Sequence, residues 1–329
     1  MNEATAAGIF ATDTPESFEQ TALKIFRFQA EECPVYRRYV SLMGIDPLAV
    51  STVESIPFMP VSFFIDHTVI SGGGTAEAVF VSSGTTGEAQ SRHHVISLDL
   101  YEESFTRTFR LFYGEPSDYA VMGLLPSYLE REDSSLIYMV KRLTELSGNI
   151  HGGFFLNDYG RLLESVDRAR TAGLQVLLIG VTFALLDLAE TYSPDLADVI
   201  VMETGGMKGR RKELIREELH AILKKRFNVT SIHSEYGMTE LLSQAYSKGE
   251  GLFSAPPWMK VLIRDSHDPL SHTAEAGAGG GISIIDLANV WSCSFIATSD
   301  LGRMHGGGTF EVSGRFDNAD IRGCNLMVS

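Results

Sequence analysis

Short apolar runs alternate with longer amphipathic stretches over most of the chain, and this alternation constrains the fold more than any other feature. Apolar runs bounded by turn residues predict strands, and apolar residues at helical spacing predict helices. Strands separated by helices imply right-handed crossovers, so the pattern predicts an α/β fold whose parallel sheet is flanked by helices. The predicted strands are Ala78–Ser82, Ala120–Leu125, Gln175–Ile179, Asp198–Glu203 and Val229–His233. The predicted helices cover residues 98–112, 134–147, 159–172, 182–191 and 210–227, the last with Ile215, Leu219, Ile222 and Leu223 on one face.

Two segments near the N-terminus carry their own signals. Thr14-Pro15-Glu16 predicts a helix start, because a hydroxyl caps the helix, proline suits its first turn and an acid faces the positive end of the helix dipole. The segment Ile56–Phe64 is aromatic and contains two prolines, so we expect a buried connecting stretch rather than a regular element.

The pattern changes after Gly251, where apolar runs are separated by Gly-rich or charged turns without a convincing helix. This texture predicts a β-rich end. We therefore expect residues 1–250 to form an α/β core and residues 251–329 to form a β-rich subdomain, packed as part of the same unit. The apolar runs are Met259–Ile263, Gly281–Asp286, Ser294–Ala297 and Thr309–Val312.

Composition narrows the functional classes. The 27 basic and 42 acidic side chains give a formal charge of −15, which disfavours an electrostatic nucleic-acid reader because such proteins present clustered Lys and Arg. No apolar run is long enough to span a bilayer, and no secretory signal is visible at the start. The three cysteines form no CxxC pair and no even disulfide framework, which favours a reducing compartment. We expect a cytoplasmic protein.

A glycine- and hydroxyl-rich loop follows the first predicted strand of the core. Its sequence is Ser82-Ser83-Gly84-Thr85-Thr86-Gly87, and a loop of this kind directs backbone N–H groups and hydroxyls at phosphate oxygens. It lacks the Gly-Lys-Ser/Thr ending of a Walker A loop. Taken alone, the same residues also suit an ordinary turn.

A second glycine turn, Gly205-Gly206, closes a predicted strand and precedes a basic run that suits a solvated face better than a site. Glycines there let the backbone approach a planar ligand, although a tight strand-to-helix turn also requires them. The segment from Tyr236 to Glu240, YGMTE, then offers an aromatic face for a base and a carboxylate for Mg²⁺, which prefers oxygen ligands.

Two further polar segments lie in the β-rich end. Asp300 in TSDLGR is expected at a strand end, where a carboxylate suits two ribose hydroxyls. Arg315 and Asp317 in GRFD add a cation and an anion. Each segment alone also reads as a turn.

In this order the segments resemble the adenylate-forming superfamily of acyl and aryl synthetases, and within it the bacterial acyl-protein synthetases of the LuxE type. The resemblance covers essentially the whole chain, including the terminal Asp320-Ile321-Arg322-Gly323-Cys324. It implies an N-terminal-domain-like core without the C-terminal lid domain of larger members. It also implies a ligase that uses ATP and Mg²⁺ to adenylate a carboxylic acid, with a fatty acid favoured.

The resemblance assigns roles residue by residue. It implies that Thr239 contacts the α-phosphate, Glu240 the Mg²⁺ and Arg315 the ribose or phosphate region, while Asp300 binds the ribose hydroxyls. Glycines 205 and 206 would border the adenine and Tyr236 would stack on it. The phosphate-cradling residues would be Ser83, Gly84, Thr85, Thr86 and Gly87.

The family resemblance also makes Cys324 informative, because the acyl-protein synthetases carry an acyl-acceptor cysteine at a matching position. The thiolate is the attacking form, and neighbouring Arg322 favours it. The acyl group would then pass to a partner such as an acyl reductase or another acyl-accepting protein. Cys33 and Cys293 are expected to be packing residues.

Two departures from the wider superfamily keep other readings open. The catalytic lysine of the lid has no counterpart, and the phosphate loop continues as Glu88-Ala89-Gln90 rather than toward a lysine. Arg92, or His93 and His94, are candidates to neutralise phosphate charge, although lone histidines are more often ordinary hydrogen-bonded side chains. The alternatives are a ligase acting on coenzyme A or a carrier protein, and a catalytically impaired nucleotide- or acyl-binding module.

Overall fold

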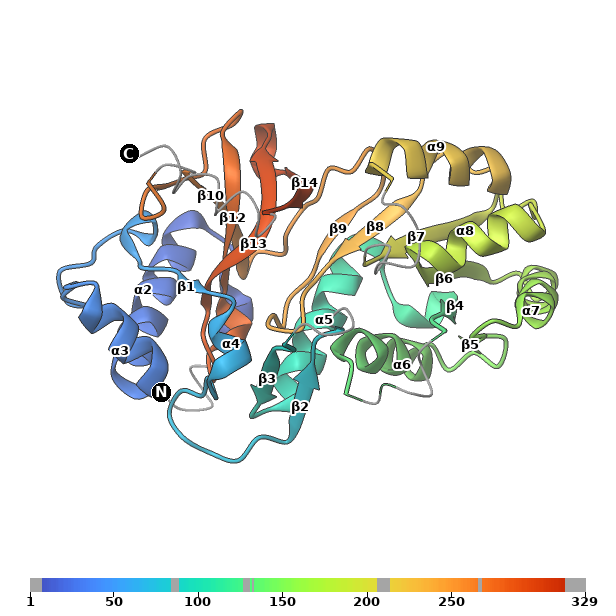
Figure 1. Cartoon of the computed structure of the whole chain (residues 1–329). Coiled ribbons are helices and arrows are strands. Elements are labelled where there is room, and N and C mark those ends of the chain that lie inside the picture. Colours follow the sequence, from blue (N-terminus) through green and yellow to red (C-terminus); the bar gives the residue numbers. More distant parts are fainter. Residues whose placement is uncertain are drawn as a thin grey trace. The chain divides into compact units, whose positions relative to one another are not determined.

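The computed structural model describes residues 8–83, 89–126, 131, 133–205, 214–265 and 268–316. The chain divides into two compact units (Figure 1). The central unit contains residues 77–93 and 97–256, and the terminal unit contains residues 1–76, 94–96 and 257–329. This division differs from the expected boundary after residue 250, because the first 76 residues group with the C-terminal strands rather than with the α/β core.

The central unit is built on a sheet with strand order β5-β4-β6-β7-β8-β9. Neighbouring strands from β5 to β8 pair in parallel, and β9 pairs antiparallel with β8. Every residue of β4 is buried, as expected for a strand covered on both faces. The strands are β4 Tyr119–Leu124, β5 Gly153–Phe154, β6 Gln175–Val181, β7 Val199–Thr204, β8 His233–Tyr236 and β9 Ala245–Ser247.

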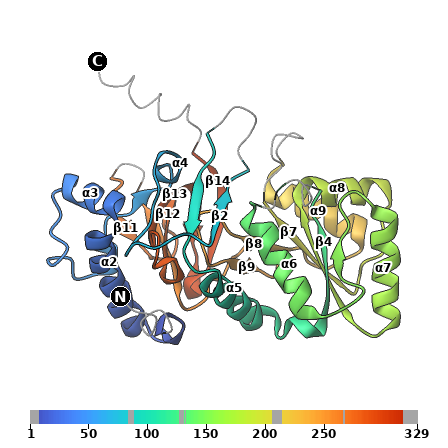
Figure 2. The ribbon, with the colours of Figure 1, turned by 90° about the horizontal axis from the view of Figure 1, so that it is seen from below.

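Helices α6 to α9 connect these strands and α5 leads into β4, with α8 and α9 on one face of the sheet and α5 and α6 on the other (Figures 1 and 2). Three of them begin at a polar cap, where Ser97, Ser134 and Asp158 accept hydrogen bonds from N–H groups in the first turn. The helices are α5 Leu98–Tyr113, α6 Ser135–Ser147, α7 Tyr159–Thr171, α8 Thr182–Thr191 and α9 Arg216–Phe227. A separate two-stranded sheet pairs β2 Ala78–Val81 with β3 Arg92–Val95.

Two predictions for this unit are wrong in detail. The strand expected at Val229–His233 begins only at His233, because α9 ends at Asn228 in a left-handed conformation and the intervening residues turn the chain back to the sheet. The expected apolar face of α9 is only half buried, since Leu219 and Leu223 are buried whereas Ile215 is 62% and Ile222 36% exposed. Residues 206–213 lie outside the described part of the chain.

The terminal unit is built on a sheet with order β1-β13-β12-β10-β11, and β14 pairs with β13. Its strands are β1 Met59–Pro60, β10 Met259–Arg264, β11 His272–Thr273, β12 Gly279–Asp286, β13 Phe295–Met304 and β14 Phe310–Arg315. Its helices are α2 Pro15–Glu32, α3 Pro34–Leu42 and α4 Phe63–Asp66. Short 3₁₀ turns occur at Gly8–Ala11, Val53–Ser55, Leu287–Asn289 and Gly306–Gly308, and at Pro116–Asp118 in the central unit.

Helix α2 confirms the predicted start, because the Thr14 side chain accepts a hydrogen bond from the backbone of Ser17 at 3.1 Å. The stretch Ile56–Phe64 is buried at most positions, as expected. It is nevertheless not irregular throughout: Met59 and Pro60 form a short parallel strand against β13, and Val61 donates its N–H to Ala297 at 2.9 Å. An edge strand tolerates Pro60 because that residue need not donate to the ladder.

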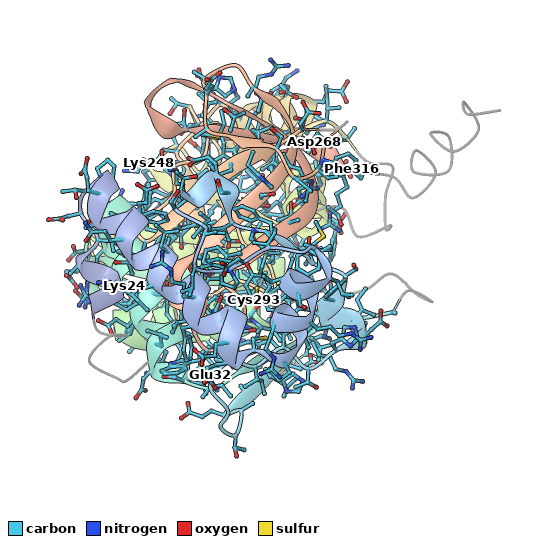
Figure 3. All side chains as sticks on the ribbon, turned by 90° about the vertical axis from the view of Figure 1, so that its left-hand side faces the viewer. Lys24, Glu32, Lys248, Asp268, Cys293 and Phe316 are labelled. Atoms are coloured by element: carbon cyan, nitrogen blue, oxygen red, sulfur yellow. The ribbon has the colours of Figure 1, made fainter. Side chains whose placement is uncertain are left out.

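Aromatic packing and one buried amide join the two ends of the chain in this core. Phe26 of α2 lies edge-on to Phe295 of β13 at 5.9 Å. The buried Gln29 donates to the carbonyl of Val290 and accepts from the N–H of Ser294, both at 2.9 Å. Cys293 lies among these packed side chains just before β13, rather than within a strand (Figure 3). No helix among the described residues has the length and apolarity needed to cross a membrane.

Candidate active site

The carboxyl ends of β7 and β8 bring two predicted site segments together in the central unit. Thr204 of β7 is the register partner of Glu235 of β8, so Gly205 and Tyr236 follow on neighbouring strands at one edge of the sheet. Gly205 has φ +68°, a conformation that glycine adopts at little cost, and it turns the chain sharply after β7. Ligands of open α/β sheets bind at this edge, outside the carboxyl ends of the strands.

Tyr236 is a wall of this edge rather than an exposed platform. Its side chain is buried, its ring lies 5.8 Å from the ring of Phe253, and its hydroxyl lies 4.0 Å from Sδ of Met238. The guanidinium of Arg216 lies over the Phe253 ring, with its Cζ atom 5.1 Å from the ring centroid. These contacts hold the Tyr236 ring in one orientation, and stacking of adenine on it stays a prediction.

Thr239 and Glu240 lie in the turn that follows β8. The turn is closed by a hydrogen bond from the N–H of Leu241 to the carbonyl of Met238 at 3.1 Å. Thr239 is half-buried and Glu240 is buried. The sequence motif therefore places a hydroxyl and a carboxylate directly beyond the strand ends where Gly205 and Tyr236 lie.

His93 fixes the backbone of this turn from β3. Its Nδ1 atom lies 2.8 Å from the carbonyl oxygen of Thr239, and the side chain is only 1% exposed. A carbonyl oxygen only accepts, so Nδ1 carries the proton in this contact. His93 thus holds Thr239 in place as a hydrogen-bonded side chain, the role expected of most lone histidines, rather than as the candidate cation for phosphate.

The sequence patterns did not indicate two carboxylates near the strand ends, Glu203, which is buried, and Glu235, which is part-buried. Glu235 accepts a hydrogen bond from Oγ1 of Thr204 at 2.5 Å, and burial raises the pKa of its carboxyl to about 7, with Glu203 raising it further against the Thr204 hydrogen bond. Burial also acts to raise the pKa of Glu203, but the nearby His220 and the charge of Arg216 bring it below its ordinary value. The available signal for Glu203 was an acid at the end of an apolar run, whereas Glu235 lies in the polar strand HSEY, which carries no such signal.

The predicted residues Asp300 and Arg315 are partners in the terminal unit. They face each other in the β13–β14 register, and Nε of Arg315 donates to Oδ1 of Asp300 at 3.0 Å. Asp300 is buried, whereas the Arg315 side chain is 76% exposed. An exposed cation over a buried carboxylate leaves Arg315 accessible to an anion, while Asp300 is already engaged.

The expected position of Asp300 at a strand end is wrong. Strand β13 continues through it to Met304, with a register shift between Leu301 and Gly302. Gly302 makes this possible, because a Cβ atom there would lie 2.3 Å from the carbonyl oxygen of Glu311 on β14. A glycine that reads as a turn signal in the sequence is here required by the close approach of two strands.

Some of the remaining predicted residues are described by the structure and others are not. Ser83 is exposed just after β2. Gly84, Thr85, Thr86, Gly87, Gly206 and Cys324 lie outside the described residues. The predicted packing residues Cys33 and Cys293 are both buried free thiols.

The carboxylates of the described residues indicate how Mg²⁺ can bind at this site. Within the described ranges no group of three or more His, Cys, Asp or Glu side chains is arranged to hold a metal. Mg²⁺ commonly takes only one or two carboxylates, together with water and substrate phosphate oxygens. Glu240 supplies one such carboxylate beyond β8, so the site fits Mg²⁺ bound together with nucleotide phosphates rather than in a protein cage.

Comparison with solved structures identifies the architecture. MatB from Rhodopseudomonas palustris, in a structure with ATP bound, matches 84% of this chain and 52% of its own with a TM-score of 0.54 at 16% identity. The fold is that of the N-terminal domain of adenylate-forming enzymes. O-succinylbenzoate coenzyme A synthetase from Bacillus subtilis, in complex with AMP, matches 74% of this chain and 62% of its own with a TM-score of 0.51 at 16% identity.

A long-chain-fatty-acid–CoA ligase from Archaeoglobus fulgidus matches 76% of this chain and 53% of its own, with a TM-score of 0.51 at 14% identity. The chain thus spans about half the length of the solved proteins that it resembles. No protein-family model and no curated protein sequence matches it. The architecture predicted from the sequence is therefore confirmed at the level of fold.

Proposed function

We propose that this chain is an ATP-dependent ligase that adenylates a carboxylic acid. The observation that carries the proposal is the meeting of Gly205 and Tyr236 at neighbouring strand ends, with Thr239 and Glu240 directly beyond, in the fold of adenylate-forming enzymes. A carboxylate oxygen attacks the α-phosphorus of ATP, and the bond from that phosphorus to the bridging oxygen breaks. The products are an acyl-adenylate and pyrophosphate.

The residues contribute positioning and charge. The turn at Gly205 lets the backbone approach the adenine, and the Tyr236 ring, held by Phe253, lines the same edge. The Thr239 hydroxyl donates to the α-phosphate, on a backbone that His93 holds still. Glu240 holds Mg²⁺, which when bound neutralises phosphate charge. Asp300 accepts hydrogen bonds from the ribose hydroxyls, and Arg315 binds in the ribose or phosphate region.

We propose further that the acyl acceptor is the thiol of Cys324. The thiolate attacks the acyl carbon, AMP leaves with the oxygen that joined it to the acyl group, and a thioester remains for delivery to an acyl-accepting protein. Support comes from the match of the C-terminal segment to LuxE-type acyl-protein synthetases. A fatty acid is the favoured substrate. The alternative acceptor is coenzyme A, because two of the solved proteins described above are ligases or synthetases of that thiol.

Exchange of labelled pyrophosphate into ATP tests the adenylation step. We expect exchange only when a carboxylic acid is present, tested over a panel of aliphatic and aromatic acids. Glu240→Gln should lower the rate at least tenfold by weakening the metal site, whereas Glu164→Gln, an exposed acid on α7, should not. Absence of exchange with every acid would overturn the proposal and leave a binding module.

Covalent labelling tests the acceptor separately. With ATP, Mg²⁺ and a labelled acid that supports exchange, the protein should acquire label that neutral hydroxylamine releases. Cys324→Ser should abolish the label and preserve exchange, and Cys33→Ala should retain both. Equal labelling of Cys324→Ser would contradict the acceptor assignment, and formation of acyl-CoA on addition of coenzyme A without protein label would establish the alternative.

A further inference from the structure

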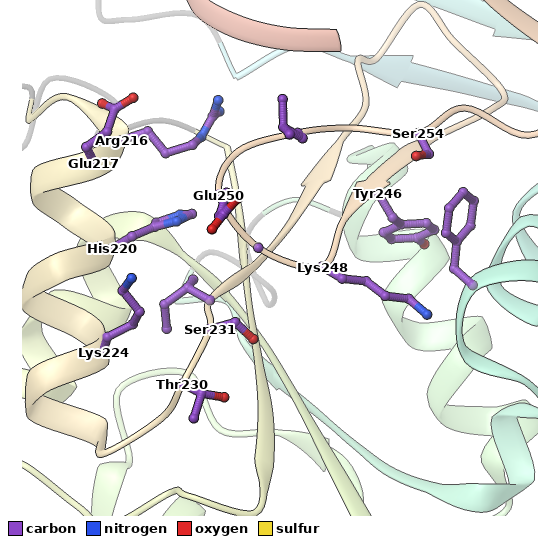
Figure 4. A pocket seen from close by; sticks show the side chains of 14 residues that line it. Arg216, Glu217, His220, Lys224, Thr230, Ser231, Tyr246, Lys248, Glu250 and Ser254 are labelled. Carbon is purple, nitrogen blue, oxygen red and sulfur yellow. The ribbon is translucent and has the colours of Figure 1, made fainter. Parts of the chain in front are cut away.

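A pocket of about 880 Å³ lies within the central unit (Figure 4). Its walls are one face of α9, the segment that leads into β8, and the loop that follows β9. A volume of this size falls in the range of small-molecule sites. None of Gly205, Tyr236, Thr239 and Glu240 lines it.

Helix α9 presents three basic side chains to this pocket. Arg216, His220 and Lys224 are spaced four residues apart, which places them in a row on one face of the helix. At 1.5 Å per residue the row extends over roughly 12 Å. The chain has a net charge of −15, so a row of basic side chains lining a cavity favours anions at this place in particular.

His220 is the buried member of the row. It is 6% exposed, and its Nε2 atom makes no hydrogen bond among the described residues, although it lies 3.6 Å from Oε1 of Glu203. Arg216 also approaches Glu203, with Nε at 3.4 Å from the same oxygen. One buried carboxylate thus faces Arg216 and His220, and the exposed Lys224 completes the row.

The rest of the pocket wall combines hydroxyls with aromatic rings. Thr230 and Ser231 line the pocket from the segment between α9 and β8, and Ser254 lies near Tyr246 on the side away from α9 (Figure 4). At the far end Tyr246 and Phe112 meet with ring centroids 5.4 Å apart. Lys248 also lines this end, with its Nζ atom 5.5 Å from the centre of the Tyr113 ring. The pocket thus offers basic side chains at both ends and aromatic rings at one end, which matches a ligand that has an anionic head and a planar body.

The loop after β9 is held in shape by its own backbone. Tyr246 and Ser254 exchange N–H to carbonyl hydrogen bonds of 3.1 and 2.9 Å, and the residues between them include Gly249, Glu250 and Gly251 with positive φ. A Cβ on Gly251 would lie 3.1 Å from Cδ of Arg216, so glycine lets the loop close onto α9. The pocket is therefore a built cavity rather than a gap beside a loose segment.

Two acids oppose the basic row. Glu217 lies at the rim beside Arg216, and the Glu250 side chain projects from the loop toward His220 (Figure 4). Glu250 adopts φ +58°, which is unusual for a residue with a side chain. Its carboxylate occupies the side of the cavity where an incoming anion would approach the row, so it acts as an internal competitor that lowers affinity.

We propose that this pocket binds a small organic phosphate, with the phosphate against the α9 row and the hydroxyls and the planar body against Tyr246 and Phe112. A phosphate uses more of these donors than a carboxylate, because it carries more acceptor oxygens and more charge. The site goes beyond adenylation and does not depend on it.

Equilibrium binding of phenyl phosphate to the full chain tests the proposal by calorimetry, with benzoate and inorganic phosphate as comparison probes. Phenyl phosphate should bind more tightly than either, and added salt should weaken it. Lys224→Gln should weaken binding on the order of fivefold, because one cation of the row is lost. Lys225→Gln is the matched control, since it removes the same charge from a position outside the pocket.

Glu250→Gln should have the opposite effect to Lys224→Gln and tighten phenyl phosphate binding several-fold, because it removes a competing negative charge. Equal affinity for the wild type and Lys224→Gln, or loss of binding when saturating ATP is present, would overturn the proposal, because the probe would then occupy another site or the nucleotide site. The measurement needs no exchange activity, so its failure and the failure of the proposed ligase function are distinguishable.

Discussion

Protonation of Glu235 couples the stability of the central unit to pH. Its pKa is raised by burial from 4.5 to about 7, so between those values the native protein keeps a proton that the unfolded chain releases. The contribution of Glu235 to the unfolding free energy therefore falls as pH rises through this window, by at most about 1.4 kcal/mol per pH unit. Burial lowers the pKa of His233 and His272 to about 4, and these two groups contribute in the opposite direction below about pH 6.5. Glu235→Gln should remove only the Glu235 contribution, which is measured as the difference between the wild-type and variant unfolding free energies in urea at pH 5, 6 and 7.

The comparison variant is Glu164→Gln, an exposed acid on α7 of the same unit. It should follow the wild-type pH profile. A Glu235→Gln variant with the same pH dependence as the wild type would show that Glu235 is already ionised in the native state at pH 5. The raised pKa of this carboxyl would then be wrong.

His93 is a positioning residue, because it acts on the reaction only through the Thr239 carbonyl. His93→Leu removes the donor to a part-buried carbonyl, a loss of about 1–3 kcal/mol, and should lower pyrophosphate exchange roughly tenfold. His93→Asn offers an amide N–H to the same oxygen and should recover part of the rate. If Leu and Asn lower exchange equally while both fold, the hydrogen bond has no part in placing the turn.

At the scale of elements, the strand pair β13–β14 depends on Gly302. A methyl group at this position would lie 2.3 Å from the Glu311 carbonyl, so Gly302→Ala forces the strands apart. Overpacking of this kind costs about 1–3 kcal/mol and should lower the melting temperature of the protein. Gly306→Ala, where a Cβ meets nothing within 4 Å and φ is not positive, should melt as the wild type does. Equal melting of both variants would contradict the packing explanation.

Elements were predictable where local pattern and tertiary packing agree. Strands β4, β6 and β7 follow their apolar runs because the sheet is covered on both faces. The prediction failed at β8, where Val229 and Ile232 are buried by packing without pairing in the sheet. It failed again at Asp300, since turn-forming residues in sequence do not reveal that a neighbouring strand requires glycine.

At the scale of the whole molecule, long-range pairing was the part that sequence reasoning could not supply. Met59 pairs with Ile296, and Gln29 bonds to Val290 and Ser294, contacts that no local pattern encodes. The strand-end residues Gly205 and Tyr236 were predictable because their motifs follow apolar runs in order. Glu203 and Glu235 were not predictable as site residues, because the side chains that contact their carboxylates come from α9 and β7.

The central claim, that a carboxylate attacks the α-phosphorus of ATP, is tested most directly by isotope transfer. The protein is incubated with ATP, Mg²⁺, a carboxylic acid labelled with ¹⁸O in both oxygens and an acceptor thiol, and the products are analysed by mass spectrometry. Adenylation predicts one ¹⁸O atom in AMP and none in pyrophosphate, because the attacking oxygen stays on the phosphorus when the thiol takes the acyl group. Label in inorganic phosphate, or unlabelled AMP accompanying thioester formation, would contradict the account.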